Sequence, residues 1–285
     1  MPSEEKEAGR VNLINYITLP MGGINSGIQM VKKKGYTIAM AGKGGTGKTT
    51  LAGLLVRFLK EHNKTPILAV DADANSNLNE VLGLEVEETL GEAREMMKKD
   101  VPVGMTKDIF MEMKVEQSLV EAHGFDLMVM GRPEGPGCYC AANSLLSKFI
   151  ERTMNNYPYL VVDNEAGMEH FSRLTTKYID LLLIVSDSSR RGILSARRIY
   201  DLVDELNIRV GRKYLVVNQY RDKLEKLVTK ETKTFGPDSV STIPEDDLIY
   251  EFDLEGKPTV ELPPDSVALQ AANEIFSKLI LEDAA

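Results

Sequence analysis

A glycine-rich run between an apolar stretch and a helical pattern constrains this chain more than any other feature. Residues 38–41 are apolar, residues 42–49 read Gly-Lys-Gly-Gly-Thr-Gly-Lys-Thr, and residues 51–60 carry apolar side chains at helical spacing. The phosphate-loop motif G-x-x-x-x-G-K-[ST] requires this context of strand, loop and helix. The sequence therefore predicts a nucleotide-binding loop, with a glycine turn that binds no ligand as the alternative.

Each part of this loop has an expected role. Glycines let successive backbone N–H groups turn inward around phosphate oxygens, and the following helix adds its positive N-terminal end. Lys48 is expected to reach the β- and γ-phosphates, and Thr49 to offer its hydroxyl to Mg²⁺. The predicted nucleotide-binding residues of the loop are Gly42, Lys43, Gly44, Gly45, Thr46, Gly47, Lys48, Thr49 and Thr50.

From residue 36 onward, apolar runs alternate with helical patterns, which is typical of an α/β fold. Strands are predicted at 36–41, 66–71, 126–131, 159–163, 180–186, 213–218 and 239–243. Most are uninterrupted apolar runs, as expected of strands buried on both faces. We expect a mostly parallel sheet of seven or eight strands with helices on both faces, forming one domain over residues 36–285. Residues 1–35 are expected to be a poorly ordered N-terminal extension.

Composition excludes several classes of protein. The formal net charge of -9 argues against a constitutive nucleic-acid surface, which needs a clustered basic face. The chain has no apolar run near the roughly 20 residues of a membrane span and no signal-peptide pattern. A cytoplasmic protein that binds neither nucleic acid nor membrane is therefore expected. In that compartment its two cysteines are not expected to form a structural disulfide.

Carboxylates follow two of the predicted strands. Asp73 is expected to orient the attacking water or to hold a Mg²⁺-bound water, whereas Asp71, closer to its strand, would be structural. The alternative is that both cap the following helix. After the fourth strand, Asp163 and Gly167 resemble the Mg²⁺-side aspartate and the γ-phosphate-sensing glycine of P-loop NTPases. Asp163 would act on the metal through water.

Both cysteines lie in the run Gly135-Pro136-Gly137-Cys138-Tyr139-Cys140, after a predicted strand and before a helix expected to begin near Ala141. Two thiols in an exposed loop can bind a soft metal, and a symmetric dimer would bring two pairs into one Cys₄ site. Such a site suits Zn²⁺ or tetrahedral Ni²⁺. The alternatives are buried small side chains or a redox pair.

Lys43 is a second lysine near the start of the loop, and it makes the loop similar to the deviant Walker A motif of the ATPases that include MinD, ParA and the nitrogenase iron protein. This resemblance implies ATP and ADP as ligands, and a homodimer that closes around two nucleotides. It also implies that Lys43 reaches the partner's nucleotide, which with Lys48 and Asp73 completes the expected catalytic set. The amide of Asn218 and the backbone at Pro244 would then contact the purine, with ordinary loop chemistry as the alternative at Pro244.

On this scaffold, the Cys-x-Cys pair and the run at residues 71–75 are similar to the CooC family of nickel-insertion ATPases and to the related AcsF. This resemblance implies a metallochaperone that carries Ni²⁺ to carbon monoxide dehydrogenase or acetyl-CoA synthase. It does not distinguish the two clients, or Ni²⁺ from Zn²⁺.

Two other functions stay open at this stage. An electron-transfer ATPase like the nitrogenase iron protein would share an iron–sulfur cluster between subunits, but that family takes one ligand from the loop after the Asp163 strand, where this chain has no cysteine. A positioning ATPase of the MinD or ParA kind could use the amphipathic segment 267–280 at a membrane. That segment carries one lysine, which favours packing in the core instead.

Overall fold

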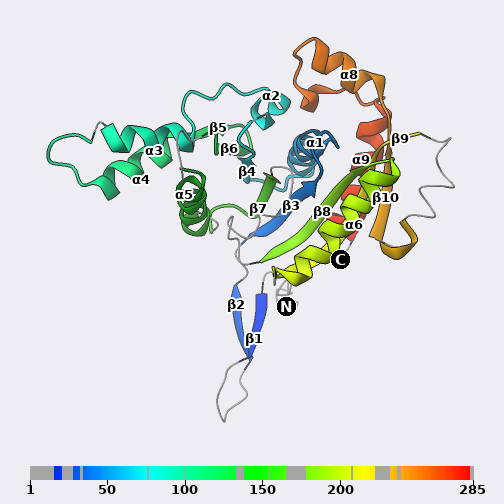
Figure 1. The fold of residues 1–285 in the computed structure, drawn as a ribbon, viewed down its shortest axis with the longest axis horizontal. Coiled ribbons are helices and arrows are strands. Elements are labelled where there is room, and N and C mark those ends of the chain that lie inside the picture. The colour runs from blue at the N-terminus through cyan, green and yellow to red at the C-terminus, as the bar shows by residue number, and fades with distance from the viewer. Residues whose placement is uncertain are drawn as a thin grey trace, which may run out of the picture.

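The computed structural model describes residues 16–20, 28–32, 35–75, 77–99, 101–132, 138–153, 155–164, 178–206, 208–221, 232–235 and 239–282. Its centre is an eight-stranded sheet with the order β10-β9-β8-β3-β7-β4-β6-β5 (Figure 1). All neighbours pair in parallel except β5 and β6, which are antiparallel. The strands are β3 (Tyr36–Gly42), β4 (Ile67–Ala72), β5 (Leu119–Ala122), β6 (Phe125–Val129), β7 (Tyr159–Asn164), β8 (Ile179–Asp187), β9 (Val210–Tyr220) and β10 (Val240–Pro244).

The sheet confirms the predicted fold class, and each of the seven predicted strands is present. Edge strand β5 was not predicted. It is four residues long and joins β6 through a tight turn in which Gly124 has a φ of +86°. A short strand that is only half-buried lacks the uninterrupted apolar run that identified the others.

Helices cover both faces of the sheet (Figure 1). On one face, side chains from α1 and α9 pack against the strands, and on the other face the cover comes from α3, α4, α5 and α6. The helices are α1 (Lys48–Glu61), α2 (Leu78–Leu82), α3 (Leu90–Lys99), α4 (Lys107–Gln117), α5 (Cys138–Thr153), α6 (Arg190–Glu205), α8 (Asp247–Leu254) and α9 (Val267–Phe276). A π-helical segment, Ser277–Leu281, continues α9.

Alternate side chains of each central strand belong to two separate hydrophobic cores, one on each face of the sheet. In β7, Val161 belongs to the core under α1 and α9, whereas Leu160 and Val162 belong to the core under α5 and α6. All three side chains are buried. Because successive side chains of a strand point to opposite faces, a strand covered on both sides must be apolar at every position. This requirement explains why the sequence pattern located these strands.

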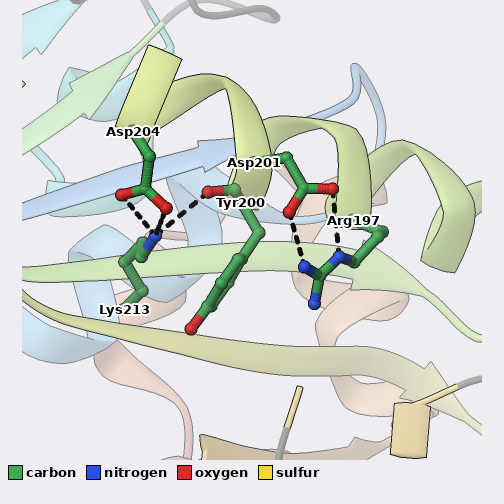
Figure 2. Close-up of polar contacts among 5 residues, drawn as sticks. All are labelled: Arg197, Tyr200, Asp201, Asp204 and Lys213. Carbon is green, nitrogen blue, oxygen red and sulfur yellow. Dashed lines mark hydrogen bonds and ion pairs between the residues drawn. The ribbon is translucent and has the colours of Figure 1, made fainter. Parts of the chain in front are cut away.

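Polar contacts between Lys213 of β9 and two residues of α6, Tyr200 and Asp204, join the helix to the strand (Figure 2). The ammonium of Lys213 donates to the main-chain oxygen of Tyr200 at 3.1 Å and to both carboxylate oxygens of Asp204 at 2.8 Å. It also lies 3.9 Å from the centre of the Tyr200 ring. One turn earlier, Arg197 pairs with Asp201 along the same helix. The contacts of Lys213 therefore hold the C-terminal half of α6 against β9.

Part of the N-terminal extension has regular structure. Strands β1 (Tyr16–Pro20) and β2 (Ile28–Lys32) pair in antiparallel fashion as a sheet of their own, outside the central sheet (Figure 1). No pattern in the sequence predicts these strands, and the domain boundary at residues 35 and 36 stays a prediction. Among the described residues, no helix combines the length and apolar character that crossing a membrane would need.

Candidate nucleotide-binding site

The predicted phosphate loop lies between the end of β3 and the start of α1. Gly45 and Gly47 have φ angles of +78° and +87°, in the left-handed region that favours glycine. A Cβ at Gly42 would lie 2.2 Å from the carbonyl oxygen of Val185, since β3 and β8 approach closely there. At Gly45, by contrast, no heavy atom lies within 4 Å of the Cβ position. The loop is therefore packed against β8 at one end and open at Gly45.

Contacts inside the loop fix its curvature. The main-chain oxygen of Lys43 accepts hydrogen bonds from the Thr46 hydroxyl at 2.9 Å and from the Lys48 ammonium at 3.2 Å. Lys48 is buried, whereas the side chain of Lys43 is exposed. The first turn of α1 contains no acidic residue, so no carboxylate there opposes the positive end of the helix. The loop thus has the shape and charge that bind an anion.

Asp163 lies at the C-terminal end of β7, behind the start of α1. Only 1% of its surface is exposed. Burial raises its pKa to about 7, with the nearby charge of Asp71 adding to the shift, while the Thr49 hydrogen bond and the Lys48 charge oppose it. Its Oδ1 has no hydrogen-bond partner among the residues that the structure describes. A buried carboxylate oxygen without a partner fits a site that takes a cation or water.

Asp71 and Asp73 have different surroundings. Asp71 is fully buried, accepts N–H groups of Asp73 and Leu78 at 3.0 Å each, and so fixes the turn from β4 to α2. Burial raises its pKa to about 6, against the lowering effect of these hydrogen bonds. Asp73 is half-buried and accepts the main-chain N–H of Asn75 at 2.9 Å. The structure thus gives Asp71 the structural role, partly as a cap of α2, while the role of Asp73 toward water stays a prediction.

The arrangement fits Mg²⁺ bound with a nucleotide. Magnesium favours one or two protein oxygens together with phosphate oxygens and water. In the described part of the chain, no three His, Cys, Asp or Glu side chains converge to hold a metal by themselves. Thr49 and the unpartnered oxygen of Asp163 are the groups that would hold Mg²⁺, directly and through water. When bound, Mg²⁺ would neutralise charge between the phosphates.

The predicted purine contacts lie on β9 and β10. The amide nitrogen of Asn218 donates to the main-chain oxygen of Thr46 at 2.9 Å, which ties the end of β9 to the phosphate loop. Pro244 ends β10 opposite Tyr220, and the next residue, Glu245, donates its N–H to the Tyr220 main-chain oxygen. Contact of Asn218 and Pro244 with a purine stays a prediction.

The structure corrects the surroundings expected for the cysteines. Helix α5 begins at Cys138, so both Cys138 and Cys140 belong to its first turn and not to a loop before a helix at Ala141. The residues before it, 133–137, lie outside the described part, as does Gly167. A proline and two glycines before Cys138 indicated a break in structure, and the helix begins directly after them.

Asn164 is a residue that the sequence analysis missed. It is 1% exposed, and its amide nitrogen donates to the main-chain oxygen of Met40 at 2.9 Å, which links the end of β7 to the strand that carries the phosphate loop. Its Oδ1 has no partner among the described residues. Its position directly after Asp163, at the end of an apolar run, was the available signal.

The C-terminal segment is part of the core. Side chains of α9 and its π-helical continuation pack on the same face of the sheet as α1, and the buried ones are Ala268, Leu269, Ala272, Ile275, Phe276, Leu279 and Ile280. The interpretation of the apolar stripe as core packing is therefore confirmed.

Comparisons with known proteins agree with this site. Residues 37–260 match the CobQ/CobB/MinD/ParA nucleotide binding domain family. An uncharacterized ATP-binding protein of Methanocaldococcus jannaschii is 41% identical over 248 residues, which cover 85% of this chain and 98% of that protein. The carbon monoxide dehydrogenase accessory protein CooC of Rhodospirillum rubrum is 32% identical over 188 residues, covering 60% of this chain and 70% of that protein.

Among solved structures, the septum site-determining protein MinD of Pyrococcus horikoshii, complexed with Mg-ADP, superposes with a TM-score of 0.65 at 21% identity. The match covers 88% of this chain and 98% of that one. At this identity the likeness concerns the fold. The phosphate-loop geometry and the match over residues 37–260 together lead to one conclusion: the chain belongs to the CobQ/CobB/MinD/ParA nucleotide-binding family and is a P-loop ATPase.

Proposed function

We propose that this ATPase is a metallochaperone, which binds Ni²⁺ through Cys138 and Cys140 at a homodimer interface and delivers it to carbon monoxide dehydrogenase or acetyl-CoA synthase. The observation that carries the proposal is the position of the Cys-Tyr-Cys run at the start of α5. Helix α5 follows β6, which runs parallel to its neighbour β4, and β4 in turn runs parallel to β7. In such sheets the helix after a strand starts near the edge where ligands bind. The two cysteines therefore belong to the same edge as the phosphate loop.

The chemistry of this position suits a soft metal ion. Thiolates are the cysteine form that binds metals, and helix N-termini favour thiolates. Two thiolates from each of two chains would complete a tetrahedral site in the dimer.

The CooC relative, a carbon monoxide dehydrogenase accessory protein, supports carbon monoxide dehydrogenase as a client, because the 32% identical match covers 70% of its length. The ATPase cycle would couple nucleotide to metal. ATP closes two copies face to face, and the exposed Lys43 of one copy reaches the nucleotide of the other. Asp73 orients the attacking water, and hydrolysis reopens the dimer. A bistable interface of this kind is a common way for a γ-phosphate to control a distant group.

Metal stoichiometry tests the proposal. Protein prepared without oxygen is dialysed against Ni²⁺ with ATP, and bound nickel is counted for the parent, Cys138→Ser, Cys140→Ser and the double variant. Each cysteine variant should lose stoichiometric nickel while binding ATP normally. Ser144→Ala, an exposed position on the same helix, is the matched control and should keep nickel. Nickel retained by the double variant would contradict the proposal.

A positioning ATPase is the second candidate, supported by the septum site-determining protein MinD of Bacillus subtilis, which is 24% identical over 254 residues. The buried apolar stripe of α9 removes the segment that suggested membrane attachment. ATP-dependent co-sedimentation with vesicles or DNA would favour this candidate over nickel delivery.

A further inference from the structure

Helix α8 presents an apolar pair on its outer side. Tyr250 and Leu254 are 64% and 68% exposed, and because they are four residues apart they lie on one face of the helix. The inner side is different: Leu248, Ile249 and Phe252 are half-buried against the core that also contains α1 and α9. Figure 1 shows α8 at the periphery of the molecule, beyond α1 and α9. An aromatic and a leucine this exposed, on a helix whose opposite side is half-buried against the core, mark a candidate contact surface.

Acidic residues surround this pair. Residues 245–255 contain six carboxylates and neither lysine nor arginine, at Glu245, Asp246, Asp247, Glu251, Asp253 and Glu255. Three of them are already used: Glu245 pairs with Arg221, Glu255 pairs with Lys257, and Asp246 caps helices. Asp247, Glu251 and Asp253 form no salt bridge with any residue that the structure describes, although the charge of Glu251 also acts on Lys257, the partner of Glu255. At 100° per residue, Asp247 and Glu251 flank the apolar pair on one side and Asp253 on the other.

The side chain of Asp246 fixes the start of this helix. Asp246 accepts the N–H of Leu248 through one carboxylate oxygen, and through the other it accepts the Ser266 hydroxyl at 2.7 Å and the N–H of Ala268 at 3.0 Å. One side chain therefore caps α8 and ties it to the start of α9. A surface fixed in this way loses little conformational entropy when a partner binds.

We propose that the outer face of α8, formed by Tyr250 and Leu254 with Asp247, Glu251 and Asp253, docks a partner protein through a basic amphipathic segment. Charge complementarity decides the occupant. Unpaired carboxylates on both sides of an apolar pair match lysine or arginine side chains that border an apolar stripe. The same carboxylates would be repelled by the anionic surface of a membrane. The inference goes beyond nickel delivery, since it uses neither the cysteines nor a metal.

A single tryptophan makes the docking measurable. The chain contains no tryptophan, so Tyr250→Trp places the sole indole in the apolar pair. The probe is a synthetic helical peptide with leucines along one face and lysines on both sides of them. Titration of the full-length protein without metal should change the tryptophan fluorescence with saturation. Added salt should weaken binding, because exposed charges are screened.

Further variants separate specific docking from general attraction. Two variants are made in the Tyr250→Trp background: Leu254→Ser, and the pair Asp247→Asn with Glu251→Gln. Each should lower the affinity for the peptide by about tenfold or more. The control pair Asp108→Asn with Glu205→Gln removes the same charge from exposed sites on α4 and α6 and should leave the affinity unchanged.

Three outcomes would overturn the proposal. One is equal weakening by the control pair, which would mean that only net charge matters. The second is equal binding of a peptide with glutamate in place of lysine, and the third is saturable binding of vesicles with anionic or zwitterionic lipids in place of the peptide. Because no nickel is present, none of these results depends on whether the metallochaperone proposal holds.

Discussion

Asp71 and Asp163 lie opposite each other on the neighbouring parallel strands β4 and β7, and both side chains are almost completely buried. Burial raises the pKa of Asp71 to about 6 and that of Asp163 to about 7, both above their ordinary value of 3.8. In the folded protein without nucleotide, both carboxyls at the expected Mg²⁺ site therefore keep their protons to a higher pH than an ordinary aspartate does.

This pair predicts an unusual pH dependence of stability. A carboxyl whose pKa is higher in the folded state binds its proton more tightly there, so the free energy of unfolding falls as pH rises from about 4 to about 7. Asp163→Asn removes the Asp163 part of this fall and should stabilise the protein without nucleotide above about pH 7, by an amount on the order of a few kcal/mol. Urea unfolding of parent and variant across this range measures it. Identical pH profiles would contradict the raised pKa.

Replacing Gly47 by alanine should be unfavourable for two reasons, backbone strain and a clash with Asn218. Its φ of +87° is left-handed, and a Cβ there would lie 2.3 Å from the amide nitrogen of Asn218. Gly47→Ala should destabilise the protein by about 1–2 kcal/mol from the backbone alone and should weaken ATP binding by displacing Asn218. Gly47→Ala with Asn218→Ala relieves the clash and not the backbone strain, so it should be more stable than the sum of the two single variants predicts. Simple additivity of the three unfolding free energies would show that the two residues do not clash.

Replacing the Asp246 side chain should lower the stability of the protein substantially. Since it caps α8 and binds near the start of α9, Asp246→Ala should cost about 1–4 kcal/mol of stability, the sum of two capping losses. Asp246→Asn keeps one oxygen acceptor and should cost less. Asp253→Ala, on the exposed side of α8, serves as the control and should change stability by less than about 0.5 kcal/mol. Thermal and urea unfolding distinguish these outcomes, and equal effects of Asp246→Ala and Asp253→Ala would refute the capping role.

Alanine variants of the two phosphate-loop lysines should lose different properties, ATP binding in one case and ATP hydrolysis in the other. Lys48 is buried in the loop, so Lys48→Ala should abolish ATP binding. Lys43 is exposed, so Lys43→Ala should bind ATP nearly as the parent does yet hydrolyse it roughly a thousandfold more slowly, the scale expected for a residue that acts in trans. Mixing Lys43→Ala with Asp73→Ala, which should still bind ATP, checks the trans arrangement. Mixed dimers should regain some hydrolysis only if Lys43 acts on the partner's nucleotide.

The sequence predicted those parts of the fold that burial dictates. Strands such as β7 and β8 are covered on both faces, so their composition alone identifies them. Edge strand β5 is four residues long and has no fully buried side chain, and β1 and β2 pair only with each other. None of these three strands therefore gave a comparable signal. The phosphate loop was predictable because its motif is local: the glycines, Lys48 and Thr49 are consecutive.

Long-range contacts were not predictable from the sequence. Nothing near Asn218 indicates that its amide reaches Thr46, 172 residues away, or that Asn164 bonds the strand of the phosphate loop. The raised pKa values of Asp71 and Asp163 depend on the register of β4 and β7, which a single sequence does not specify. The start of α5 at Cys138 was missed because proline and glycine are common in loops and also common just before helices.

The central claim is that ATP closes two copies around two nucleotides and one shared metal ion. Native mass spectrometry of oxygen-free protein with Ni²⁺ and either ADP or ATP tests it most directly. With ATP, the account predicts a dimer that carries two nucleotides and one nickel, and loss of the nickel in the Cys138→Ser and Cys140→Ser double variant. Nickel bound to monomers in a cysteine-independent way, or an ATP-bound dimer without nickel, would contradict the claim.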